Sequence, residues 1–93
     1  MRIIGNIEHP LLKITVFKMD NRVSVKFENT LYEQTFKLGD DERVATLEAI
    51  QQLVDAPFIE QVQKTFRQMH QTKLSGFART LPVAIKADFE QII

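Results

Sequence analysis

Alternation of apolar and polar residues from Leu12 to Leu38 constrains the fold of this chain more than any other feature. A period of two is typical of β-strands that have one buried face. The pattern breaks at Asp20-Asn21 and at Asn29-Thr30, and these residue types suit tight hairpin turns. The segment therefore predicts a three-stranded antiparallel meander. Its expected buried residues are Leu12, Ile14, Val16, Val23, Val25, Phe27, Tyr32, Phe36 and Leu38.

Two-residue turns at both breaks would fix which residues stand opposite one another. Apolar residues would then meet apolar ones and unlike charges would meet. Gln34 would fall on the apolar face opposite Val25, where its amide needs hydrogen-bond partners. The expected pairs are Val16–Val25, Ile14–Phe27, Phe27–Tyr32, Val23–Phe36, Lys13–Glu28, Lys26–Glu33 and Ser24–Thr35.

Helical spacing replaces the strand pattern after Gly39. Asp40 or Asp41 can cap a first helix, expected over 41–55, and Pro57 prevents that helix from continuing. A second helix is expected over 57–72. A loop at Ser75, Gly76 and Phe77 then leads to a third helix that Thr80 caps and that runs to the end of the chain.

The expected fold class is α+β, with one domain spanning residues 1–93. Residues 1–39 form the meander, to which Arg2, Ile3 and Ile4 are candidates for a fourth strand. Residues 40–93 form two or three helices packed on its apolar face. A domain this small has a limited core, so self-association is a natural way to cover leftover apolar surface.

Composition limits the classes of function. The chain has 12 basic and 12 acidic residues, no cysteine, and no apolar run long enough for a membrane span or a signal peptide. We therefore expect a soluble cytoplasmic protein. The acids are concentrated in residues 40–60. This uneven charge fits either an acidic helix lying against a basic one or a basic surface for an anionic partner.

No residue pattern indicates catalysis, a metal site or a cofactor. His9 and His70 lack metal-ligand spacing, and Ser24 and Ser75 lack the context of a catalytic nucleophile. Isolated glycines cannot form a phosphate-binding loop. We expect a protein that is not an enzyme.

A homodimer is the leading expectation for the partner. Phe17 and Met19 fall on the face of the meander that the helices do not need to cover, and other apolar residues lie near its ends or at the C-terminus. The candidate interface comprises Phe17, Met19, Leu11, Leu31, Phe89, Ile92 and Ile93.

Nucleic-acid binding is the alternative expectation. Glutamine, lysine and arginine side chains of the second helix can contact phosphates and base edges, and an aromatic residue in the following loop can stack on a base. The zero net charge weakens this reading. The candidate residues are Gln61, Lys64, Arg67, Gln68, Gln71, Lys73, Phe77 and Arg79.

Three segments of the amino-terminal part, His9–Met19, Val23–Phe27 and Leu31–Lys37, resemble short uncharacterised proteins of Bacteroidetes-type bacteria. The resemblance covers about the first 40% of the chain. No activity is assigned to that family, so the resemblance implies a bacterial cytoplasmic origin and no particular chemistry.

Overall fold

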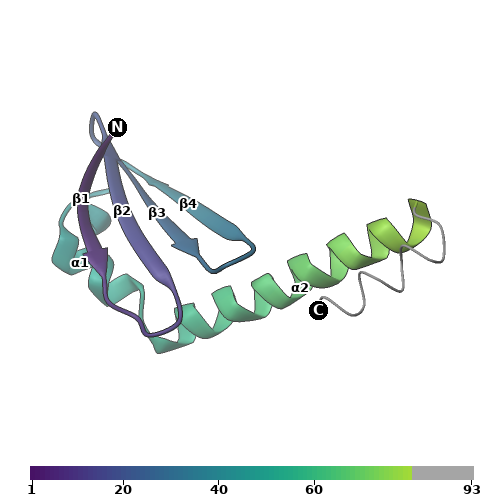
Figure 1. Cartoon of the computed structure of the whole chain (residues 1–93). Coiled ribbons are helices and arrows are strands. Elements are labelled where there is room, and N and C mark those ends of the chain that lie inside the picture. Colours follow the sequence, from purple (N-terminus) through teal and green to yellow (C-terminus); the bar gives the residue numbers. More distant parts are fainter. Residues whose placement is uncertain (81–93) are drawn as a thin grey trace. The chain divides into compact units, whose positions relative to one another are not determined.

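A computed structural model describes residues 1–80 as an antiparallel sheet followed by helices (Figure 1). The strands follow one another in the order β1-β2-β3-β4, which confirms the predicted α+β meander with its fourth strand. The chain divides into two compact units, residues 1–63 and residues 64–93. The elements are β1 (Arg2–Ile7), β2 (Lys13–Met19), β3 (Arg22–Glu28), β4 (Glu33–Gly39), the 3₁₀ helix η1 (Glu42–Val44), α1 (Leu47–Leu53) and α2 (Ala56–Thr80).

The hairpin between β2 and β3 has the predicted register. Its two-residue turn consists of Asp20 and Asn21, and Met19 stands opposite Arg22. Asp20 adopts a positive φ of 56°, which Asp and Asn tolerate better than most residues. The predicted pairs Val16–Val25, Ile14–Phe27 and Lys13–Glu28 are all present.

The predicted register between β3 and β4 is wrong by two residues, because the chain turns at Thr30 and Leu31, one residue later than expected. The Asn29 side chain accepts hydrogen bonds from the amides of Leu31 (2.9 Å) and Tyr32 (2.8 Å), which stabilises a turn from Asn29 to Tyr32. A register shift of two residues leaves every side chain on its predicted face of the sheet. The observed pairs are Val25–Phe36, Phe27–Gln34, Lys26–Thr35 and Ser24–Lys37, in place of Val23–Phe36, Phe27–Tyr32, Lys26–Glu33 and Ser24–Thr35.

The strand β1 is longer than the predicted Arg2–Ile4 and contains a β-bulge between Ile3 and Gly5. Gly5 lies on the side of the sheet that meets α1. A Cβ atom at this position would lie 2.7 Å from Cδ2 of Leu47, which is closer than van der Waals contact. The missing side chain therefore lets α1 approach the sheet.

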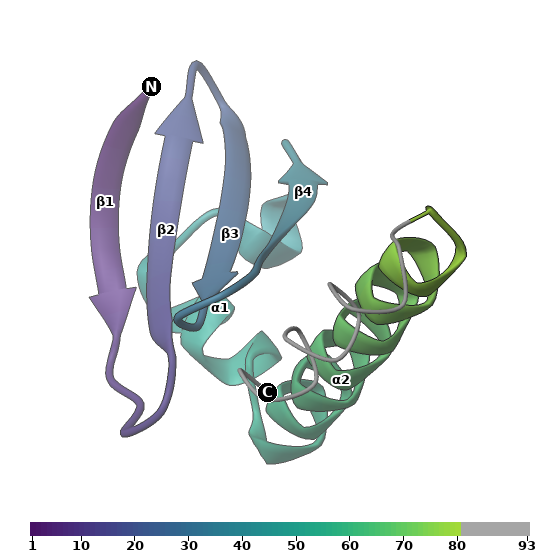
Figure 2. The same ribbon diagram turned by 45° about the vertical axis from the view of Figure 1, so that its right-hand side comes forward.

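The core of residues 1–63 lies between one face of the sheet and the helical segments (Figure 2). Phe27 is fully buried, and its ring centroid lies 5.6 Å from that of Phe36 and 5.6 Å from that of Phe58. Gln34 also lies on this face, and its side-chain amide donates a 2.9 Å hydrogen bond to the Val62 carbonyl. This bond provides the partner that a buried amide requires. The buried apolar residues of this unit are Leu12, Ile14, Val16, Val23, Val25, Phe27, Val44, Ile50, Val54 and Val62.

The single helix predicted over 41–55 is instead two short helices. Asp41 caps η1 by accepting a hydrogen bond from the Arg43 amide. Thr46 has extended backbone angles and accepts a hydrogen bond from the Ala49 amide (3.1 Å), so it starts α1 as a second N-cap. The break leaves Val44 and Ile50 both buried.

The second predicted helix is longer than expected, and the loop predicted at Ser75–Phe77 is wrong. The helix α2 begins after Asp55, whose side chain accepts from the Phe58 amide (3.0 Å), and it continues through Gly76 to Thr80. A single glycine costs a helix only about 1 kcal/mol relative to alanine, which its neighbours can offset. Thr80 is therefore the last residue of α2, and the predicted third helix lies outside the described residues.

Candidate functional site

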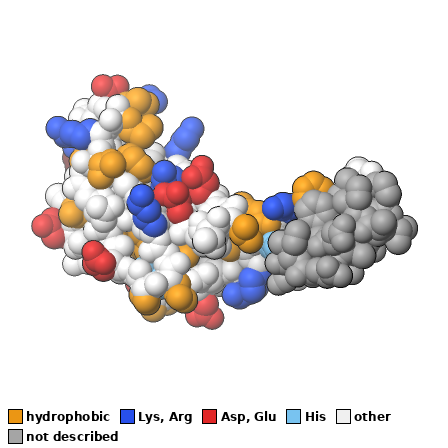
Figure 3. Space-filling model, viewed as in Figure 1, with side chains coloured by type: hydrophobic (Ala, Val, Ile, Leu, Met, Phe, Trp, Pro, Cys, Tyr) orange, Lys and Arg blue, Asp and Glu red, His pale blue; other side chains and the backbone are white. Residues whose placement is uncertain are grey.

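One face of the sheet points away from the core, and we call it the outer face. Three of its apolar side chains lie together at the end where β1 begins and β2 ends. Ile3 stands opposite Phe17, and Met19 lies two residues further along β2. Ile3 is 59% exposed, Met19 is 51% exposed and Phe17 is half-buried. We refer to Ile3, Phe17 and Met19 as the apolar patch; in Figure 3, hydrophobic side chains gather over this end of the sheet.

Polar groups border the apolar patch. The Lys26 ammonium lies 5.2 Å from the centre of the Phe17 ring, where it gains a cation–π attraction. The same ammonium lies 3.3 Å from Glu28 Oε1. Thr15, next to Lys26 across the strands, is 3% exposed, and no hydrogen bond to its hydroxyl is found among the described residues. The centre of the outer face is thus closely packed, although none of the helices within residues 1–80 covers it.

The structure separates the residues of the predicted interface. Phe17 and Met19 belong to the apolar patch, whereas Leu11 and Leu31 lie at the other end of the strands, about 20 Å away for a seven-residue strand. Leu11 is 74% exposed and Leu31 is 62% exposed. Phe89, Ile92 and Ile93 lie outside the described residues. Ile3 was not among the predicted contacts, and its place opposite Phe17 was obscured by the bulge in β1.

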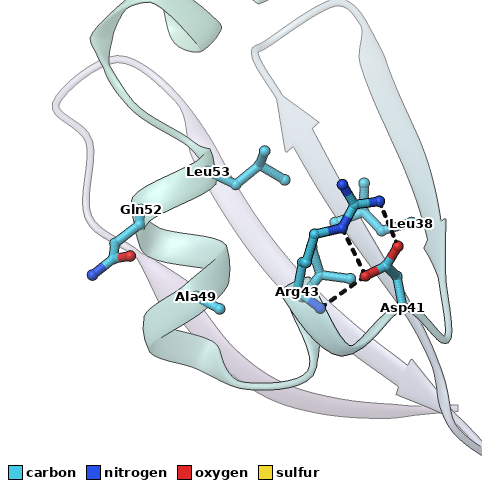
Figure 4. Close-up of a pocket in the computed structure, with 7 residues that line it drawn as sticks. Leu38, Asp41, Arg43, Ala49, Gln52 and Leu53 are labelled. Atoms are coloured by element: carbon cyan, nitrogen blue, oxygen red, sulfur yellow. Dashed lines mark hydrogen bonds and ion pairs between the residues drawn. The ribbon is translucent and has the colours of Figure 1, made fainter.

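A second feature is a groove of about 510 Å³ between the end of β4 and α1 (Figure 4). Leu38 lies at a β-bulge of β4, and such bulges re-aim side chains. Leu53 projects from α1 toward Leu38 and Arg43. This groove was not predicted from the sequence, because it depends on the break between η1 and α1. The lining residues are Leu38, Asp41, Arg43, Val44, Ala49, Gln52 and Leu53.

An ion pair lies in this groove. Asp41 accepts hydrogen bonds from Arg43 Nε (3.0 Å) and Nη2 (2.7 Å), as well as from the Arg43 backbone amide (2.8 Å). The side-chain hydrogen bonds and then the backbone one lower the pKa of Asp41 from its ordinary 3.8 to about 2. The same contacts raise the pKa of Arg43. Arg43 is therefore largely engaged by its neighbour.

Replacing Arg43 with glutamine should raise the pKa of Asp41 from about 2 toward 3.8, because only the backbone hydrogen bond would remain of the present donors. The lowered pKa stabilises the native state fully above about pH 3.8, and this contribution disappears as the pH falls through about 2. A ¹³C NMR titration of the side-chain carboxyl groups measures both values. An unchanged pKa in the variant would show that Arg43 is not its cause.

The predicted nucleic-acid face is divided by the helical geometry of α2. At 100° per residue, Lys64, Gln68 and Gln71 share one side of the helix, whereas Lys73 and Phe77 lie on nearly the opposite side. The Lys73 ammonium lies 5.9 Å from the centre of the Phe77 ring. Arg67 lies between these two sides. Arg79 and Gln61 lie on the same side as Lys64. Lys73 and Phe77 are therefore separated from the other predicted contacts of α2.

Among residues 1–80, no three or more histidine, cysteine, aspartate or glutamate side chains are grouped so that they could hold a metal ion. The described helices include none with the length and apolar character needed to cross a bilayer. Comparisons with protein families, curated proteins and solved structures find no match to this chain.

Proposed function

We propose that this chain is a non-enzymatic protein-binding domain that forms a homodimer through the outer face of its sheet. The observation that supports it is the apolar patch, in which Ile3 and Met19 remain more than half exposed beside Phe17. Large apolar side chains that are adjacent and exposed mark interaction surfaces, whereas single ones are ordinary. A two-fold axis through the patch would bring the same side chains of two copies together.

The size of the sheet sets the extent of the contact. Four strands of about seven residues present a face of roughly 400 Å² in projection. A standard interface buries about 800 Å² of accessible surface per partner, so the apolar patch alone is too small. Lys26 borders the patch, and Lys13 and Glu28 lie further along the outer face. These mixed charges would form the polar part of the proposed interface.

Changing Phe17 to aspartate should convert the dimer to a monomer, because taking a carboxylate out of water at the centre of the patch costs more than its attraction to the adjacent Lys26 returns. Size-exclusion chromatography with light scattering should give twice the chain mass of 10.8 kDa for the native protein and that mass itself for the variant. Leu53→Asp is the matched control, since Leu53 is a partly exposed apolar residue of α1. It should leave the dimer intact.

A native protein that stays monomeric at high micromolar concentration would contradict the proposal. Unchanged mass in Phe17→Asp would place the dimer contact elsewhere. Leu31→Asp maps the extent of the interface, since Leu31 lies at the opposite end of the strands from Met19. We expect it to weaken the dimer less than Phe17→Asp does.

A further inference from the structure

The strand β4 forms one edge of the sheet, and the side turned away from β3 has no strand partner within residues 1–80. The Asn29 amide donates to the Tyr32 carbonyl (3.0 Å), so these two residues form the first hydrogen-bonded pair of the hairpin. Bonded and non-bonded pairs alternate along antiparallel strands. The backbone amides and carbonyls of Glu33, Thr35 and Lys37 therefore point to the free edge, which can template another extended chain.

The groove lies beside this edge. Leu38 belongs to β4 and also lines the groove, and Ala49 and Leu53 of α1 form the facing wall. Side chains of a strand alternate between the two faces of a sheet. A strand added along β4 would thus place every second side chain on the α1 side, next to Leu38. The groove volume of about 510 Å³ is within the usual range of about 300–1,000 Å³ for ligand pockets.

The charge around the groove favours a cationic occupant. Residues 38–53 carry four carboxylates and one guanidinium, a net charge of −3. The guanidinium is the Arg43 group that Asp41 already engages. Parallel pairing of β4 with β4 of a second chain would bring two such acidic segments together, which disfavours that arrangement. Lysine or arginine side chains on a partner would instead meet Asp40, Glu42 and Glu48, which are all exposed.

We propose that the free edge of β4 and the groove bind an extended peptide whose apolar residues alternate with polar ones and are flanked by lysine or arginine. The peptide backbone adds as a fifth strand, which gives affinity, and one apolar side chain occupies the groove, which gives selectivity. This site lies apart from the outer face, so the inference does not depend on the homodimer.

The test uses the full chain and a fluorescein-labelled peptide of sequence Lys-Lys-Val-Thr-Leu-Thr-Val-Lys-Lys, with binding followed by fluorescence anisotropy. Two further peptides carry N-methyl groups, either on both threonines or on the three apolar residues. An antiparallel added strand bonds to β4 through its threonine amides, and a parallel one through its apolar residues. We expect one methylated peptide to lose binding and the other to keep it.

Two pairs of variants locate the site. Ala49→Phe fills the groove and should raise the Kd of the parent peptide roughly tenfold or more, since it removes the pocket for the anchoring side chain. Gln51→Phe adds the same ring at an exposed position of α1 and should leave the Kd unchanged. Glu48→Lys should weaken binding more at low salt than at high salt, whereas Glu60→Lys, which lies in α2, should not.

Four results would overturn this inference. The first is equal affinity for both methylated peptides, which would mean that backbone pairing is not involved. The second is a parental Kd in Ala49→Phe, with its far-UV circular dichroism unchanged. The third is no binding of the parent peptide at about 1 mM, which corresponds to only about −4 kcal/mol. A dimer that Ala49→Phe dissociates would also overturn it, because a second copy would then be the occupant.

Discussion

Replacing Phe27 with alanine is expected to lower the free energy of unfolding by about 3–5 kcal/mol. Phe27 is 0% exposed, and the rings of Phe27, Phe36 and Phe58 all contact one another, so its removal takes away the fully buried member of an aromatic cluster. The lost burial and the cavity both contribute, and the edge-to-face contact with Phe36 adds to them. A typical small domain is stable by only about 5–15 kcal/mol.

Guanidinium chloride unfolding followed by circular dichroism at 222 nm measures this difference. Phe17→Ala is the matched control, because it removes the same atoms from the half-buried outer face. It should cost clearly less than Phe27→Ala. Equal losses for the two variants would mean that the aromatic cluster does not dominate the core of residues 1–63.

Replacing Ile50 with alanine is expected to cost about 2–5 kcal/mol. Ile50 is 0% exposed, and it is the buried residue of the short helix α1. A helix of seven residues is not stable alone in water, so α1 depends on packing against the sheet. Loss of this anchor should therefore release α1 as well as leave a cavity.

Leu53→Ala in the same helix is the control for this prediction. Leu53 is 38% exposed, so the same kind of truncation should cost much less. Hydrogen exchange measures the local effect, and the amides of α1 should lose protection in Ile50→Ala but keep it in Leu53→Ala. Similar exchange in both variants would show that Ile50 does not hold α1 in place.

The sheet was predictable because alternation reports directly on burial. All the residues between Leu12 and Phe27 that were predicted to be buried are buried. The alternation cannot locate a turn to within one residue, however, and a register shift of two residues leaves each side chain on the same face of the sheet. The observed turn depends on hydrogen bonds that the backbone amides of Leu31 and Tyr32 donate to the Asn29 side chain, a local interaction that competes with the ladder.

The helical half was harder to predict because local signals conflict there. Thr46 is a good N-cap, but it lies inside a run whose apolar spacing also fits one longer helix. Gly76 favours a loop by propensity, yet α2 continues through it. Such conflicts are resolved by packing, which propensity does not contain.

The candidate sites were likewise predictable only where they depend on strand alternation. Phe17 and Met19 were predictable as outer-face residues, since strand alternation places them there. Ile3 was missed because the bulge in β1 changes the alternation between Ile3 and Gly5. The groove at Leu38 was missed because it needs a bulge and a helix break at the same place.

The turn at Asn29 has a consequence for the interior of the molecule. With the turn at Asn29 and Thr30, Phe36 would stand opposite Val23, two positions away from its present partner Val25. Its ring would then be displaced along the strand by about 7 Å, beyond the distance at which it meets Phe27. The position of one surface turn therefore selects which aromatic rings meet in the core. Insertions or deletions in this loop should change the stability of the domain more than the loop's exposure suggests.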